Sequence, residues 1–288
     1  MNTFAQTTLS TPDDSLKSGA RQPVFFMSHG GGPWPYMEGA FHALFAPLGT
    51  ALRAVPHQLP QAPRAVLVIS AHWEEPVFTV STAAKPGMLY DYYGFPPHTY
   101  SVRYPAPGSP EIGQRIAGLL SDAGWPVATD DQRGFDHGTF CMMQEIYPDA
   151  SVPVVQMSLK HGLDPAEHIA LGKLLQPLRD EGVLIIGSGQ SFHNLRLHGA
   201  AARQASEVFD QWLQQAMALP QTAQRHQALI DWAQAPAARL AHPREEHLLP
   251  LMVIAGAAGE DAAHLIFSEF LADSRTSAFR FGTLATAA

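Results

Sequence analysis

The chain has 288 residues, of which 46% are hydrophobic and 15% are charged, and its formal net charge is −8. This composition suits a soluble globular protein with a large core, and the absence of any basic cluster argues against a nucleic-acid partner. No apolar run approaches the roughly 20 residues that cross a bilayer, so we expect no membrane partner. The single cysteine, Cys141, excludes an intramolecular disulfide and a cysteine-built zinc site, and it fits a reducing, cytoplasmic setting.

The chain reads as one domain, because no linker rich in Pro, Gly or Ser divides its middle. We assign residues 21–288 to this domain. Residues 1–20 are polar, contain aspartates and lack an apolar segment. They are therefore predicted to form a flexible N-terminal arm rather than a secretory signal.

The predicted elements alternate between strands and helices. In the first two thirds of the chain the predicted strands lie over 23–29, 62–73, 77–82, 152–159 and 183–194, the last of which runs into a loop. The predicted helices between them lie over 36–55, 109–124 and 165–182. The strand over 77–82 is expected to pair beside the one over 62–73. The last third is mostly helical, with helices over 205–219, 222–235 and 245–259 and an edge strand over 278–284. This alternation predicts an α/β fold, a single layered domain with a central, mostly parallel or mixed sheet and helices on both faces.

Three of the 14 histidines occupy equivalent places in this scheme. His29, His72 and His193 each lie at or just beyond the carboxyl end of a predicted strand. In open α/β sheets this edge is where ligands bind. A single histidine after a strand is usually an ordinary loop residue, but three at matching positions predict one shared site.

A metal explains these histidines better than a phosphate does. The glycine run after His29 continues into Pro33 and Trp34, and it matches neither the Walker pattern nor the dinucleotide fingerprint. Neutral imidazoles bind Zn, Cu, Fe and Ni. Gly31 and Gly32 would let the backbone turn sharply and leave space beside the metal for a substrate.

Six short blocks, in chain order, carry a resemblance to a known family: SHGGGP, SAHWEE, DYYGFP, FDHGTF, SFHNL and EEHLLPL. Together they resemble the DOPA-dioxygenase type of class III extradiol ring-cleavage dioxygenases, which are related to the catalytic subunit of protocatechuate 4,5-dioxygenase. The resemblance covers nearly all of the chain after the N-terminal arm. It implies an enzyme that opens a catechol ring with O₂, with Fe(II) needed for activity and Zn(II) as the metal that some members carry when purified.

The same resemblance implies the metal ligands. His29 and His72 match the two early ligands, and His247 matches the later one. Related enzymes fill the position of His247 with a glutamate, so Glu245 or Glu246 is the alternative third ligand. On a helix the three side chains would point in different directions, at about 100° per residue, so only one could face the metal well.

Two further histidines are implied to act in the reaction. His193 matches the catalytic base of the wider superfamily and is alternatively an additional metal ligand. His137 is placed to hydrogen-bond substrate or oxygen, and Asp136 is expected to orient it.

The predicted substrate wall is the segment 89–108, which is rich in Tyr and Pro. Tyr92 and Tyr93 would stack on the ring or hydrogen-bond to it, and His98 and Arg103 would bind a substrate carboxylate. The expected partners are a small aromatic diol and O₂, and the expected state is a monomer or small homo-oligomer. Two alternatives stay open: a zinc hydrolase using a metal-bound water on the same histidines, and a non-catalytic binding protein with the same fold.

Overall fold

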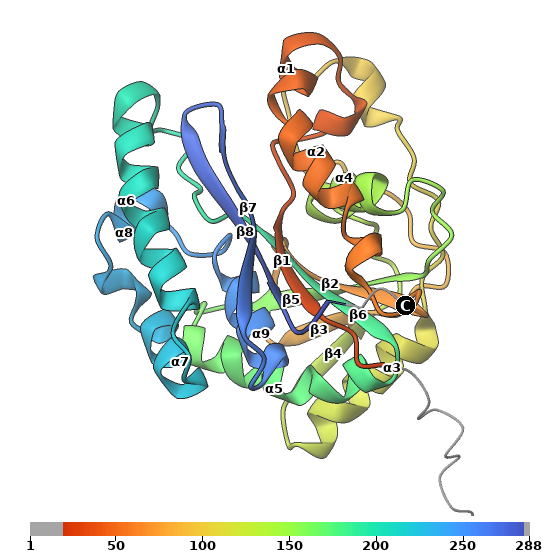
Figure 1. Ribbon diagram of the computed structural model, residues 1–288. Helices are drawn as coiled ribbons and strands as arrows, with labels where there is room; N and C mark the ends of the chain where they lie inside the picture. The colour runs from red at the N-terminus through yellow and green to blue at the C-terminus, as the bar shows by residue number, and fades with distance from the viewer. Residues whose placement is uncertain (1–19, 285–288) are drawn as a thin grey trace, which may run out of the picture.

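The computed structural model describes residues 20–284, which form one sheet covered by helices (Figure 1). Most of the predicted N-terminal arm lies outside these residues. The strands are β1 (Val24–Ser28), β2 (Ala65–Glu75), β3 (Phe78–Ser81), β4 (Val127–Asp130), β5 (Val154–Lys160), β6 (Val183–Gly189), β7 (Ala263–Leu271) and β8 (Ser274–Phe281). The helices are α1 (Gly39–Leu44), α2 (Ala46–Arg53), α3 (Pro110–Asp122), α4 (His137–Ile146), α5 (Pro165–Asp180), α6 (Gly199–Met217), α7 (Thr222–Ile230), α8 (Ala238–Ala241) and α9 (Leu249–Ala258).

The sheet is mixed, with a parallel centre. Its order is β4-β3-β5-β2-β6-β1-β8-β7. The four central strands, β5, β2, β6 and β1, run parallel, whereas β8 is antiparallel to β1 and β3 is antiparallel to β5. The predicted α/β fold with a mixed sheet is confirmed.

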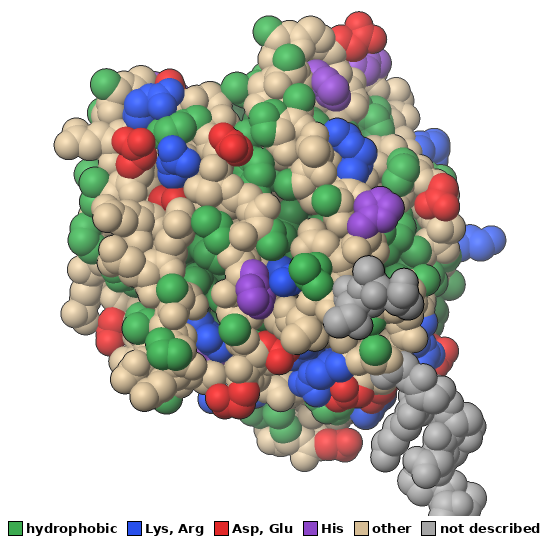
Figure 2. Space-filling model, in the orientation of Figure 1, with side chains coloured by type: hydrophobic (Ala, Val, Ile, Leu, Met, Phe, Trp, Pro, Cys, Tyr) green, Lys and Arg blue, Asp and Glu red, His purple; other side chains and the backbone are tan. Residues whose placement is uncertain are grey.

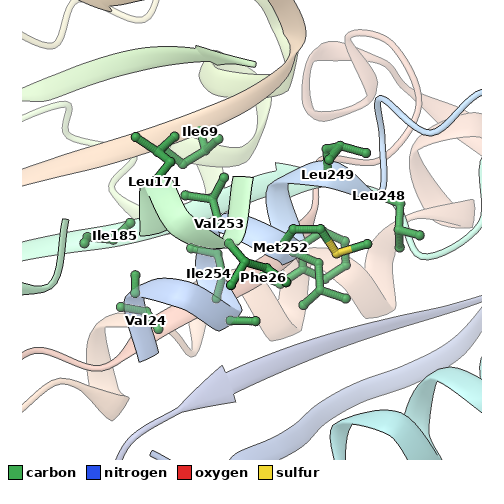
Figure 3. Packing of buried hydrophobic residues seen from close by; sticks show 14 of the residues in the cluster. Val24, Phe26, Ile69, Leu171, Ile185, Leu248, Leu249, Met252, Val253 and Ile254 are labelled. Atoms are coloured by element: carbon green, nitrogen blue, oxygen red, sulfur yellow. The ribbon is translucent and has the colours of Figure 1, made fainter. Parts of the chain in front are cut away.

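Alternate residues of the central strands enter two cores on opposite faces of the sheet. Phe26 and Ile69 pack with α3, α5 and α9 in one core, while Phe25 and Val68 pack with α2 and α4 in the other. Both neighbours in each strand are buried because helices cover both faces, which is typical of parallel sheets. Figure 3 shows the first core, where Met252, Val253 and Ile254 of α9 lie among strand side chains.

Four details of the predicted elements are wrong. Strand β3 does not pair with β2, because β5 and β6 occupy both edges of β2. Strand β8 is not an edge strand, since the unpredicted strand β7 lies outside it. The helix over 36–55 is divided into α1 and α2, and Pro47 at the start of α2 accounts for the break because its ring cannot continue a helix. The helix over 245–259 begins only at Leu249.

Helices α5 and α9 approach each other through two glycines. A Cβ atom on Gly172 would lie 2.0 Å from the carbonyl oxygen of Val253, and one on Gly256 would lie 2.0 Å from that of Ile169. We therefore expect Gly172→Ala to lower the free energy of unfolding by about 1–3 kcal/mol, because the backbones must separate. Urea denaturation would measure the loss. Gly118→Ala on α3 is the control, since a Cβ there would meet nothing within 4 Å, and it should be neutral or stabilising.

The surface carries mixed charge. On the face shown in Figure 2, Lys and Arg side chains are interspersed with Asp and Glu. None of the helices in residues 20–284 is both long enough and apolar enough to cross a membrane.

Candidate metal centre and active site

Three neighbouring parallel strands bring histidines to one edge of the sheet. Strand β6 lies between β1 and β2. His29 directly follows β1, His72 lies near the end of β2, and His193 lies in the loop after β6. The structure therefore brings together the three histidines that the strand ends singled out.

An irregularity in β2 aims His72 at this edge. The pairing of β2 with β5 changes register between Ile69 and Glu74, so His72 lies in a bulged stretch of the strand. The Ser70 hydroxyl accepts a hydrogen bond from the backbone N–H of His72 at 3.2 Å. Bulges of this kind commonly redirect a side chain beside an active site.

Two more histidines reach the site from outside the strands. His137 is the first residue of α4, and His247 lies in the turn that precedes α9. Their rings face the same cluster: the ring centroids of His72 and His137 are 4.1 Å apart, and those of His72 and His247 are 4.9 Å apart.

Three imidazole nitrogens converge as the ligands of one ion would. The Nε2 atom of His72 lies 3.3 Å from the Nε2 atoms of both His29 and His247. Two nitrogens bound to one tetrahedral ion at about 2.0–2.1 Å would lie about 3.3–3.4 Å apart. The three residues thus form a group that could hold a metal.

The protonation of these rings fits a metal as well. Burial, together with the neighbouring histidines, lowers the pKa of His29 and His247 well below the usual value, and burial lowers the pKa of His72 to about 3. The rings are therefore neutral near pH 7. The Nδ1 atoms of His72 and His247 face carboxylates, so each Nε2 presents a lone pair toward the others. Facing lone pairs repel each other unless a cation lies between them.

Glu246 bonds to histidines rather than taking their place. Its Oε1 atom accepts from Nδ1 of His247 at 2.9 Å and lies 3.4 Å from Nδ1 of His193. Burial would raise the pKa of Glu246, but the interaction with His193 lowers it, so the group is a carboxylate. Glu245 instead pairs with Arg239 at 2.6 Å. Because these residues lie in a turn, the helical geometry expected for them does not apply.

Asp91 makes the equivalent connection on the other side of the cluster. Its Oδ1 atom accepts from Nδ1 of His137 at 2.8 Å, and its Oδ2 atom lies 3.3 Å from Nδ1 of His72. Burial opposes ionisation, yet the hydrogen bond and charge of His137, with His72, lower the pKa of Asp91 to about 2. Each carboxylate thus holds one prospective ligand and one prospective catalytic histidine, in the manner that fixes the tautomer of metal-binding imidazoles.

The prediction that Asp136 orients His137 is wrong, because Asp91 is the aspartate that binds the His137 ring. The Asp136 side chain caps α4 by accepting from the N–H of Thr139, and it also accepts from Ser70 at 2.8 Å. Sequence reasoning missed Asp91, although this residue opens the DYYGFP block.

Asp91→Asn is expected to weaken metal binding or turnover by about 10–100-fold, because an amide cannot accept from both histidines and hold both rings. A metal titration of the stripped protein and steady-state kinetics would measure the two effects. Asp122→Asn at the end of α3 is the control. Unchanged metal affinity and turnover in Asp91→Asn would contradict the positioning role.

A pocket of about 560 Å³ opens beside the histidines. Its volume lies in the range of about 300–1,000 Å³ that is usual for small-molecule sites. The predicted substrate-contacting residues that line it are Gly31, Gly32, Tyr92 and Tyr93. His98 and Arg103 do not line it: Nε2 of His98 lies 3.1 Å from the Tyr36 carbonyl oxygen, and Arg103 lines a separate groove.

The glycines after His29 make room for aromatic rings rather than leaving the space empty. A Cβ on Gly31 would lie 3.0 Å from the Phe45 ring, and one on Gly32 would lie 2.4 Å from the Phe95 ring. Gly32 also has a φ of +49°, which disfavours other residues. The loop therefore sets an aromatic wall against the metal-binding edge.

Known proteins resemble this chain along most of its length. Residues 23–286 match the family described as the catalytic LigB subunit of aromatic ring-opening dioxygenase. A protein of Hapsidospora irregularis named dioxygenase tasH is 37% identical over 264 residues, covering 83% of this chain and 79% of that protein. A protein of Beta vulgaris named 4,5-DOPA dioxygenase extradiol is 42% identical over 216 residues, covering 72% and 78%. The crystal structure of an uncharacterized protein from Escherichia coli K12 superposes with a TM-score of 0.73 at 28% identity, covering 91% of this chain and 100% of that chain.

Proposed function

This chain belongs to the family of aromatic ring-opening dioxygenases typified by the catalytic LigB subunit, and we propose that it opens a substituted catechol at an Fe(II) ion bound by His29, His72 and His247. The family makes it an extradiol dioxygenase, whose substrates are an aromatic diol and O₂. The identity of the metal, the ligand set and the roles of the other side chains are our proposal.

The observation that carries this proposal is the convergence of three neutral imidazoles in the wall of an aromatic pocket, where Nε2 of His72 lies 3.3 Å from Nε2 of His29 and 3.3 Å from Nε2 of His247. Neutral histidine nitrogens are suitable ligands for iron and for zinc. When bound, Fe(II) would supply coordination of the catechol oxygens and electron transfer to O₂. Zn(II) would bind at the same nitrogens without redox chemistry.

The side chains around the ligands divide the remaining work. We assign His193 to accept a proton from a catechol hydroxyl, because its Nδ1 faces Glu246 and its Nε2 is then left with a lone pair. We assign His137 to hydrogen-bond the oxygen atoms at the reacting end of the substrate, with its ring held by Asp91. Tyr92 contributes a face of the pocket, since its hydroxyl already donates to the Thr99 carbonyl oxygen.

The test is oxygen uptake by metal-stripped protein reconstituted anaerobically with Fe(II) or with Zn(II). Each sample would receive a panel of catechols. We expect uptake and a yellow ring-opened product with Fe(II) only, while the Zn(II) protein binds catechols without consuming O₂. If a folded, iron-loaded protein takes up no oxygen with any catechol, the ring-opening function is wrong. Ester and amide hydrolysis by the Zn(II) sample would then support the hydrolase.

We further propose a cytoplasmic enzyme that acts as a monomer or small homo-oligomer, without a nucleic-acid or membrane partner. Its support is the net charge of −8 and the buried free thiol of Cys141, which suits a reducing compartment. Light scattering on the metal-loaded protein would determine the oligomeric state.

A further inference from the structure

We propose that the pocket selects catechols whose ring substituent is uncharged and apolar, over catechols that carry a carboxylate. This inference rests on the proposed function and names the substrate class of the same site. It is carried by the residues of the wall beyond the histidines, which would contact the substituent rather than the diol.

The wall is aromatic and aliphatic. None of the residues that line this pocket, within the described part of the chain, is Lys or Arg. Its large apolar members are Phe41, Phe45, Tyr92, Tyr93, Phe95, Phe192, Leu195 and Leu271. A carboxylate that enters such surroundings loses its hydration without gaining a counter-ion, which is unfavourable.

Two cations near the pocket are engaged elsewhere. Arg275 lies on β8 between two residues that line the pocket, so strand alternation turns it to the other face. Its guanidinium lies 4.4 Å from the centroid of the Phe270 ring and donates to Ser268. Arg244 donates to both carboxylate oxygens of Glu74 at 2.5 Å. Neither arginine lines the pocket.

The groups that sequence reasoning assigned to a carboxylate lie elsewhere too. Arg103 lines a separate groove together with Lys85, and His98 lies outside the pocket wall. Arg196 follows Leu195 on the loop after β6, but it is exposed and does not line the pocket.

The two amide side chains of the wall, those of Gln190 and Asn194, already make hydrogen bonds within the protein. Gln190 accepts from the Ser28 hydroxyl at 2.6 Å and donates to the Gly30 carbonyl oxygen at 2.7 Å. Asn194 donates to the Leu240 carbonyl oxygen at 2.8 Å and accepts from a backbone N–H at 3.0 Å. Each amide nitrogen donates one of its two N–H groups in these bonds, and neither amide carries a charge. The remaining N–H of either residue could hydrogen-bond a substrate carboxylate but would not neutralise it, so these residues add less affinity for a charged substituent than a cation would.

Apolar surface continues to the mouth of the pocket. Leu195 is 77% exposed and Tyr93 is 91% exposed, and both line the pocket. Large apolar side chains left in water at a pocket mouth commonly mark a contact surface. An alkyl or aryl substituent would cover them, whereas a charged one would not.

The test compares catechols of matched size on the Zn(II)-loaded protein, which binds without turnover, and on the Fe(II)-loaded protein. The matched pair is 4-propylcatechol and 3-(3,4-dihydroxyphenyl)propanoate, with DOPA as a third ligand. We expect calorimetry to give a Kd at least about tenfold lower for 4-propylcatechol, because the carboxylate is desolvated without a partner. The ratio of kcat/KM should follow the same order.

A variant makes the inference specific to this wall. Leu195→Arg places a cation at the mouth and should reduce the preference for 4-propylcatechol several-fold, while Leu265→Arg, on β7 and outside the pocket, should leave it unchanged. Equal or tighter binding of the propanoate or DOPA by the parent protein would overturn the inference, as would propanoate binding that disappears in Arg196→Ala.

Failure of the inference can be told from failure of the proposed function. Oxygen uptake with a preference for carboxylate substrates would overturn only the inference. A preference for the neutral catechol in calorimetry, without oxygen uptake in the iron-loaded sample, would support the inference and overturn the ring-opening function. Absence of binding by every catechol would overturn both.

Discussion

His193→Ala is expected to lower kcat by about 10²–10⁴-fold, the usual contribution of a general base, while the protein keeps its metal. The His193 ring stacks on that of His247 with centroids 3.4 Å apart, and Glu246 lies 3.4 Å from its Nδ1 atom. This arrangement leaves Nε2 directed away from the carboxylate and available to a substrate hydroxyl. Stopped-flow kinetics and metal analysis on the same preparation would measure both quantities.

The control for His193→Ala is His198→Ala, an exposed position at the start of α6 that does not line the pocket. Imidazole added to the solution can take the place of the missing His193 ring as a base. We therefore expect imidazole to restore some activity to His193→Ala and to have no such effect on His198→Ala. Loss of metal together with activity, and no response to imidazole, would instead make His193 a ligand and contradict its role as the base.

The strand-end histidines could be predicted because parallel strands deliver their carboxyl ends to a common edge. His29 and His193 needed only that rule and the apolar runs of β1 and β6. His72 obeyed it less directly, since a bulge in β2 aims its ring, and no feature of the apolar pattern marks the bulge. The positions of His29 and His193 thus follow from regular strands, whereas the direction of the His72 ring depends on an irregular stretch of β2.

Asp91 shows why the rest could not be read from the sequence. It lies in a long connection without strands and is 46 residues from His137, whose ring it holds. No periodicity relates two such positions, and Asp136 was a better guess on proximity alone. Strand β7 was missed for a different reason: it follows a helix and has several exposed positions, so its pattern resembles a loop more than a buried strand.

The geometry of residues 245–247 could not be predicted either, because the sequence pattern indicated a helix where the chain forms a turn. A helix allows only one of three consecutive side chains to face a site, but the turn before α9 lets Glu246 and His247 act on it together. One residue offers Nε2 to the cluster while its neighbour binds the Nδ1 atom of the same ring. The carboxylate of Glu246 and the imidazole of His247 are therefore not alternatives: the imidazole is the prospective ligand, and the carboxylate holds it in place.

His247→Ala is expected to abolish metal retention and turnover, whereas Glu246→Gln should keep the metal with about 10–100-fold weaker affinity. The His247→Ala substitution removes one of the three converging nitrogens. The Glu246→Gln substitution leaves that nitrogen in place and only weakens the contact that holds the His247 ring. Because a metal at a thousandfold excess over its Kd stabilises the folded state by about 4 kcal/mol, the rise in Tm on metal addition should vanish only in His247→Ala. Glu245→Gln, which loses a pairing with Arg239, is the matched control. If Glu246→Gln lost the metal and His247→Ala retained it, the carboxylate of Glu246 would be the third ligand and His247 would not be one.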